Sequence, residues 1–128
     1  MKRSAGLWID HTQAFLVFVG DGAEEAQHVK SGMEAHVRFS GGNRREDGSA
    51  DDKQDRQFAT HLNRYYDEVI AQLGDAAAIL IFGPGEAKGE LKSRLAHKGL
   101  EGRIVGVEVA DKMTPPQIAA KVREHFQI

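Results

Sequence analysis

The segment GPGEAK, residues 83–88, combines residue types that could do chemistry at the end of an apolar run. It follows AILIF and precedes a polar, helix-forming sequence, which predicts a strand, a tight turn and a helix N-terminus. Such a corner can bind phosphate, because free backbone N–H groups and the helix dipole point toward it. However, the segment matches neither the Walker pattern nor the three-glycine dinucleotide pattern. Pro84 also removes one donor, and the Glu86 carboxylate repels phosphate. We therefore expect a structural corner and no cofactor, nucleotides included.

Asp10, at the end of the run LWI, is the residue placed best for metal chemistry. In ribonuclease-H-like folds an aspartate on the first strand commonly joins other carboxylates around divalent cations. The partners here would be Glu68, Glu108 and Asp111. This arrangement predicts an alternative function, a metal-dependent nuclease or phosphoesterase. The sequence IDHT is equally typical of a hairpin turn in which the aspartate bonds its neighbouring backbone, so both interpretations stay open.

The other polar residues show no catalytic or metal-binding pattern. The six histidines are scattered without HExxH spacing, and FSGG differs from the GxSxG nucleophile motif. The sequence has no cysteine, which excludes disulfides, thiol catalysis and thiolate zinc sites. We predict no metal site from these residues.

Basic residues follow the GPGEAK corner and also occur in and beside the polar segment 41–55. If they meet on one side of the molecule, they form a phosphate-binding patch. The alternative is a solvated helix face balanced by Glu86, Glu90 and Glu101. The net charge of -2 provides no general basic field, so nucleic-acid binding requires a local patch. The predicted binding residues are Arg44, Arg45, Arg56, Lys88 and Lys92.

The length of 128 residues is that of one domain with its own core. The N-terminal segment has no apolar leader, and no run approaches the ~20 apolar residues of a membrane span. We therefore expect a soluble, cytoplasmic protein that does not contact membranes.

The predicted elements change type halfway along the chain. GLWI, AFLVFV, AQHVKSG and EAHVRFS indicate an antiparallel meander, with one or two strands in its last two segments. A stripe at helical spacing follows, formed by Phe58, Leu62, Tyr65, Val69, Ile70 and Leu73. It predicts a helix ending at Gly74, before the strand AAAILIF, a helix, the strand RIVGVEVA and a helix capped by Thr114 and Gln117. Because strands joined through helices pair in parallel, this order predicts a mixed α/β sheet of ribonuclease-H-like or ribosomal-protein-like architecture.

The segment GGNRREDGSADDKQD, residues 41–55, contains no apolar residue larger than alanine. It cannot bury a face, so we predict a flexible polar loop inside a single domain of residues 1–128. Long loops in compact domains are often functional, whereas the alternative here is a tolerated surface insertion.

Together these segments resemble the central domain of Pelota and of archaeal and eukaryotic class 1 peptide release factors. The resemblance centres on AILIFGPGEAKGELKSRL, in which Gly83, Pro84, Gly85 and Lys88 match the family's strand, corner and helix start. GLWIDHTQAFLVFV resembles the opening hairpin of that domain, and RYYDEVIAQL resembles its long helix. With GRIVGVEVADKMTPPQIAAKVREHF included, the chain also resembles small bacterial release-factor-like proteins that are labelled host-attachment proteins.

The resemblance implies a translation-associated module that binds the ribosome or transfer RNA, in ribosome rescue or peptide release. Release factors carry Gly-Gly-Gln in the loop before the long helix, where this chain has Gly41, Gly42 and Asn43. Asparagine is one methylene shorter, so its amide reaches a different point. Pelota lacks the catalytic motif, so the fold does not entail hydrolysis. If the chain is an enzyme, the resemblance implies peptidyl-tRNA hydrolysis with Gly42 and Asn43 positioning water. A non-catalytic protein-interaction module is a further alternative.

Overall fold

The computed structural model describes residues 3–20, 22–31 and 48–127, and in its longest helix it describes side chains from residue 60 onward. The predicted order, a meander followed by alternating helices and strands, is confirmed. The elements are β1 (Ser4–Ile9), β2 (Gln13–Gly20), β3 (Ala23–Lys30), α2 (Gly48–Leu73), β4 (Ala78–Gly83), α3 (Ala87–His97), the short 3-10 helix η1 (Glu101–Arg103), β5 (Ile104–Val109) and α4 (Pro115–Phe126).

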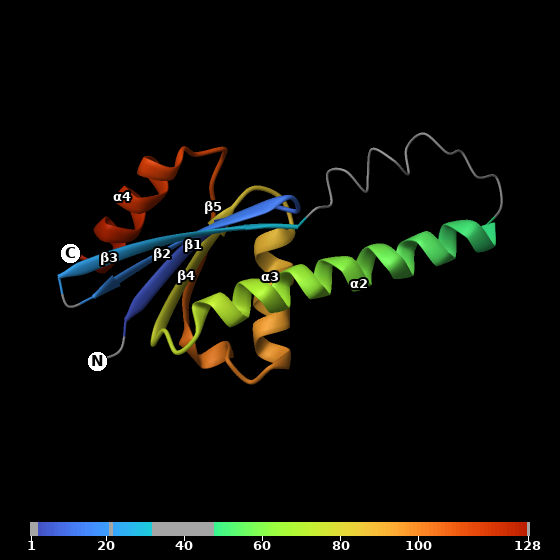
Figure 1. The fold of residues 1–128 in the computed structure, drawn as a ribbon, viewed down its shortest axis with the longest axis horizontal. Coiled ribbons are helices and arrows are strands. Elements are labelled where there is room, and N and C mark those ends of the chain that lie inside the picture. Colours follow the sequence, from blue (N-terminus) through green and yellow to red (C-terminus); the bar gives the residue numbers. More distant parts are fainter. Residues whose placement is uncertain (1–2, 21, 32–47, 128) are drawn as a thin grey trace.

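The strands form one five-stranded sheet in the order β3-β2-β1-β4-β5 (Figure 1). β1 pairs antiparallel with β2 and parallel with β4, and β4 pairs parallel with β5. α3 provides the crossover that a parallel β4–β5 pair requires. Near its start β5 has one more residue than β4, because Ile79 pairs with Ile104 and Leu80 with Gly106. The predicted mixed α/β sheet is therefore confirmed.

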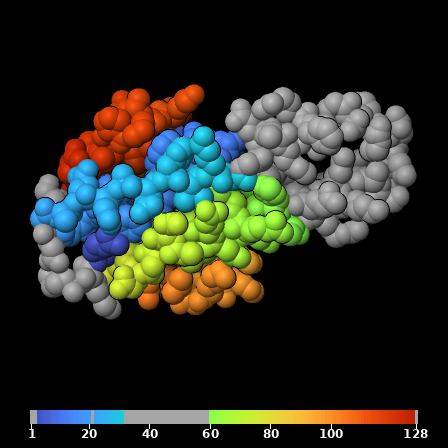
Figure 2. All heavy atoms as spheres, viewed as in Figure 1, coloured from blue at the N-terminus to red at the C-terminus, as the bar shows by residue number. Residues whose placement is uncertain are grey.

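Helices cover both faces of this sheet, with α2 and α3 on one face and α4 on the other (Figure 1). Because successive strand residues point to opposite faces, the continuous apolar runs of β1, β2 and β4 fill two cores. On the first face Leu7 and Ile81 belong to the same core as Leu91, and on the second Trp8 belongs to the same core as Ile118. Figure 2 shows the red surface of α4 and the green and orange surfaces of α2 and α3 on opposite sides of the blue strands.

Two element boundaries differ from the predictions. α2 begins at Gly48, so residues 48–55, which were expected in a loop, are helical. This segment contains no proline, and a helix that is polar on all sides has no apolar stripe to reveal it in the sequence. β3 begins at Ala23, before the start of the predicted strand AQHVKSG at Ala26, because Gly22, with a φ of 72°, completes the chain reversal just before it. Residues 41–47 and the candidate strand EAHVRFS lie outside the described residues.

The predicted helix ends are present. Gly74, with a φ of 59°, follows the last residue of α2 and donates its N–H to the carbonyl of Ile70. Thr114 and Gln117 form the capping box at the start of α4. None of the helices in the described part of the chain is long and apolar enough to cross a membrane.

Candidate functional site

Two corners lie together at the carboxyl ends of the parallel strands β1 and β4. The first corner, Asp10–Gln13, joins β1 to β2, and the second corner, Gly83–Lys88, joins β4 to α3. Trp8 pairs with Phe82, so the residues that end the two strands, Ile9 and Gly83, are also neighbours. The carboxyl edge of parallel strands is the usual position of ligand sites in open α/β sheets. This edge is therefore the candidate site.

The shape of the second corner is set by its backbone. Gly83 has a φ of 151°, and a Cβ atom at this position would lie 2.2 Å from the carbonyl oxygen of Ile9. Gly85 has a φ of 65°, but a Cβ atom there would meet nothing within 4 Å. Glu86 occupies the N-cap position of α3 without a side-chain capping bond, and the Lys88 ammonium donates to the carbonyl of Gly85. Because Gly83 has no side chain, this corner can lie directly against the backbone of β1.

The first corner is closed by its side chains. The Asp10 Oδ1 atom accepts hydrogen bonds from the Thr12 backbone N–H at 2.8 Å, the Thr12 hydroxyl at 2.9 Å and the Gln13 N–H at 2.9 Å. Ser31, which follows β3, donates its hydroxyl to the His11 carbonyl at 2.7 Å. This is the turn-closing arrangement that aspartate favours after a strand.

The carboxylates predicted to join Asp10 around a metal are not assembled there. Glu108 forms an ion pair with Lys121 at 2.9 Å, and Glu68 and Asp111 are exposed. Among the described residues, no group of three or more histidine, aspartate and glutamate side chains is arranged to hold a metal ion. The observed geometry of Asp10 therefore fits the hairpin interpretation.

Two buried tyrosines of α2 bind one corner each. The Tyr65 hydroxyl donates to the carbonyl of Asp10 at 2.9 Å, in the first corner. The Tyr66 hydroxyl donates to Glu90 Oε1 of α3 at 2.6 Å, beside the second corner. His11 Nε2 lies 3.0 Å from the same Glu90 oxygen, so a chain of polar contacts joins the first corner, α2 and α3.

Both phenols are held in the neutral, donating form. Burial raises the pKa of Tyr65 above the ordinary range, and the nearby Asp10 carboxylate adds to this effect. Burial also raises the pKa of Tyr66, with the hydrogen bond to Glu90 as the second cause. These groups therefore act as fixed donors near neutral pH.

A cleft of about 480 Å³ lies between α2 and α3, next to this chain of contacts. Its walls mix apolar and hydrogen-bonding groups and are formed by Leu62, Asn63, Tyr66, Glu90, Ser93, Arg94 and His97. The Arg94 guanidinium is held at one wall by two hydrogen bonds to Asp67, at 2.7 and 3.0 Å. These hydrogen bonds hold the pKa of Asp67 below its usual range. The Tyr66 phenol and the Glu90 carboxylate both line this cleft.

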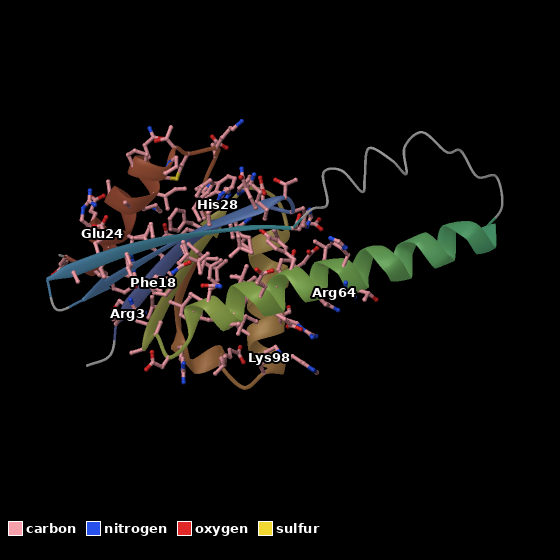
Figure 3. The ribbon with its side chains drawn as sticks, in the orientation of Figure 1. Arg3, Phe18, Glu24, His28, Arg64 and Lys98 are labelled. Carbon is pink, nitrogen blue, oxygen red and sulfur yellow. The ribbon has the colours of Figure 1, made fainter. Side chains whose placement is uncertain are left out.

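The basic residues of α3 are divided between two sides of the helix. Arg94 and Lys98 both contact Asp67 of α2, the second at 3.5 Å. Figure 3 labels Lys98, the residue that follows α3, and Arg64 on α2. Lys88 and Lys92 instead line two grooves between α3 and β5, of about 340 and 410 Å³. Among the described residues, neither of these two lysines forms an ion pair, so they are the basic charges of α3 that no carboxylate neutralises, although the Lys88 ammonium donates to the Gly85 carbonyl.

The structure places only some of the predicted site residues. Gly42, Asn43, Arg44 and Arg45 lie outside the described residues, and Arg56 lies in the part of α2 whose side chains are not described. Whether these arginines meet Lys88 and Lys92 therefore stays a prediction.

The sequence does not predict the chain of polar contacts between the first corner, α2 and α3. In the sequence Tyr65 belongs to an apolar stripe, His11 is one of six scattered histidines, and Glu90 is a counter-charge of a basic helix. The pair Tyr65–Tyr66 carried no signal either, because the same stripe contains the adjacent pair Val69 and Ile70, and all four residues are buried in one core. Glu90 and His11 carried no signal of their own.

No protein-family model matches the chain, and no curated protein is similar to it in sequence. Solved structures are similar. The Thermoplasma acidophilum Pelota protein matches 96% of this chain and 32% of its own length, with a TM-score of 0.61 and 17% identity. Archaeoglobus fulgidus Pelota matches 96% of this chain and 31% of its own, with a TM-score of 0.57 and 15% identity. An archaeal translation termination factor, aRF1, matches 98% of this chain and 40% of its own at 13% identity, but its TM-score of 0.47 is too low to establish a common fold.

The chain therefore has the fold of about a third of a Pelota protein. At this level of identity the similarity establishes the architecture alone. The part of the prediction that concerns a Pelota-like fold is confirmed. The resemblance to small bacterial host-attachment proteins stays a prediction.

Proposed function

We propose that this chain is a translation-associated module that binds the ribosome or transfer RNA in the cytoplasm. The observation that carries the proposal is the Pelota fold, which covers 96% of the chain. The resemblance of the sequence, centred on the second corner, supports the same conclusion. The activity of a whole Pelota protein does not follow, because this chain spans only about a third of one.

The binding surface in this proposal begins at Lys88 and Lys92. The two residues are four apart on α3, so they lie on one face of the helix. They are free of ion pairs among the described residues, in contrast to Arg94 and Lys98. Two lysines are a small patch on a chain with a net charge of -2, so the proposal also includes Arg44 and Arg45. Binding to RNA through such a patch is electrostatic and falls with salt.

The test is cosedimentation of the purified protein with ribosomes through a sucrose cushion across a salt series. We expect binding at low salt that weakens as salt rises. The Lys88→Ala/Lys92→Ala variant should bind more weakly, with the slope of log affinity against log salt reduced by about 0.7 for each phosphate that the variant no longer neutralises. Arg44→Ala/Arg45→Ala should act in the same direction.

The matched control is Lys121→Ala/Arg123→Ala, which removes two positive charges from α4 on the opposite face of the sheet. This variant should bind like the wild type. Absence of ribosome and transfer RNA binding at low salt would reject the proposal, and equal weakening in control and test variants would reject the assigned surface.

A further inference from the structure

β5, at one edge of the sheet, carries a row of exposed apolar side chains. Large hydrophobic side chains that are exposed within the described residues occur only in this strand, at Val105, Val107 and Val109, with exposed fractions of 50%, 36% and 80%. They alternate with Gly106 and Glu108, so they recur every second residue. Soluble proteins seldom leave a β-branched edge strand of this kind uncovered.

At this edge, backbone hydrogen-bonding groups of β5 also point away from the sheet. In the described part of the chain, β5 is the last strand of the sheet on its side. The N–H of Ala110 donates to the carbonyl of Gly83 at 3.1 Å, so the backbone groups of Ala110 and of every second residue before it point toward β4. The N–H and C=O groups of Val107 and Val109 therefore point away from the sheet.

The opposite edge, β3, is protected. Its exposed positions include Glu24, Glu25 and Lys30, and Figure 3 shows Glu24 and His28 along this strand. Arg123 of α4 forms an ion pair with Glu24 at 2.8 Å. Arg3, just before β1, forms an ion pair with Glu25 at 2.5 Å. Charged side chains on an edge strand discourage pairing with another sheet.

We propose that β5 pairs antiparallel with β5 of a second copy of this chain, about a two-fold axis at Val107. In this register Val107 faces Val107 of the partner subunit, and its outward N–H and C=O groups form the reciprocal bonds of a hydrogen-bonded pair. Val105 of each copy faces Val109 of the other copy. The exposed valines of the two copies therefore lie next to one another. Such β-branched cross-strand pairs stabilise a sheet.

The charges near the edge are compatible with a second copy. Glu108 faces Gly106 across the axis, which avoids placing like charges directly opposite, and Lys121 already neutralises Glu108 at 2.9 Å within each copy. Lys92 and Glu101 line the groove beside Val105, so each copy presents both signs there. Because the β3 edge is charged, the contact closes as a dimer and does not propagate into a filament.

The first experiment measures mass by sedimentation equilibrium from micromolar to millimolar concentration. The wild-type chain should form dimers, and Val109→Lys should raise the dimer dissociation constant about tenfold, since it disrupts two symmetry-related pairs. Val109 is the most exposed of the three valines, so the variant should remain folded by circular dichroism. The matched control is Ala26→Lys on the exposed β3 edge, which should dimerise like the wild type.

Two further variants test the register. V105E/V109K should recover the dimer, because each introduced ammonium faces the partner's introduced carboxylate only in the antiparallel register centred on Val107. Val107→Cys should form a disulfide-linked dimer under mild oxidation, since hydrogen-bonded antiparallel residues have Cα atoms about 5.5 Å apart. The natural chain has no cysteine, so this thiol is unique, and Ala26→Cys is its control.

A wild-type chain that remains monomeric at every concentration would overturn the proposal. A dimer that tolerates Val109→Lys would also overturn it, by placing the interface elsewhere. Val107 lines the same grooves as Lys88 and Lys92, but these measurements are made without ribosomes, so their failure is distinguishable from a failure of ribosome binding.

Discussion

The two corners at the carboxyl ends of β1 and β4 are neighbours, yet they are built in opposite ways. The first corner is closed by the Asp10 carboxylate, which accepts three hydrogen bonds through one oxygen. The second corner depends on the absence of a side chain, because Gly83 touches the backbone of Ile9. Both contain residue types that suggest catalysis or phosphate binding. In the structure both use them to join a strand to the next element.

The difference shows where chemistry is available at this edge. The Asp10 carboxylate and the Gly83 backbone are occupied by local contacts, whereas Tyr66 and Glu90 both line the cleft between α2 and α3. Substitutions that separate the roles of charge, hydrogen bonding and sterics should therefore have different effects in the two corners.

The largest expected effect is that of Gly83→Ala. The new Cβ atom would lie 2.2 Å from the Ile9 carbonyl oxygen, so β1 and β4 would have to separate. We expect the free energy of unfolding to fall by about 3 kcal/mol or more. Urea denaturation followed by circular dichroism measures this change.

Gly85→Ala is the matched control, because Gly85 also has a positive φ but open space around it. Its cost should be confined to backbone strain, about 1–2 kcal/mol. Equal costs for the two variants would show that contact with β1 does not determine the second corner.

In the first corner, Asp10→Ala should lower the free energy of unfolding by about 2 kcal/mol, because two backbone N–H groups and the Thr12 hydroxyl lose their acceptor. Asp10→Asn keeps an oxygen that can accept the same bonds and should cost less than about 1 kcal/mol. Thermal unfolding of both variants gives the comparison. If asparagine proves as damaging as alanine, the negative charge of Asp10 is needed to hold these three hydrogen bonds.

Most of the fold could be predicted because it depends on apolar patterns. The continuous runs in β1, β2 and β4 indicate strands buried on both faces, and the stripe from Leu62 to Leu73 indicates a helix on a core. The start of α2 could not be predicted, since residues 48–55 are polar and contain no such stripe. Both corners were also found, because each is a contiguous segment with its own turn residues.

The contacts between the corners could not be predicted. His11, Tyr66 and Glu90 come from three different parts of the chain, and only packing of α2 and α3 on the sheet brings them together. Glutamate in the first turn of a helix is common for electrostatic reasons, so Glu90 alone indicated nothing more. The same limit applies to Lys88 and Lys92, whose spacing predicts a common face but does not predict that this face lies beside β5.

Smaller losses than those of Gly83→Ala and Asp10→Ala are expected for the two tyrosines through which α2 contacts the corners. Tyr66→Phe should lower the free energy of unfolding by about 1.5 kcal/mol, because its hydroxyl donates to a carboxylate. Tyr65→Phe should cost about 1 kcal/mol, since its acceptor is the neutral carbonyl of Asp10. Denaturant unfolding at neutral pH measures both. The reverse order would show that the first corner depends on α2 more than the second corner does.

Alkaline titration sharpens the same comparison, because Tyr65 and Tyr66 are the two tyrosines of the sequence. Their pKa values are raised in the folded state, so the unfolded chain loses these protons first, near pH ~10. Stability should therefore be retained below that pH and fall as the pH rises above it. Tyrosinate absorbance should appear together with the loss of circular dichroism, in the wild type and in each single variant. Absorbance that rises before unfolding in Tyr65→Phe would mean that Tyr66 ionises in the folded protein, and that its bond to Glu90 does not hold α2 to the second corner.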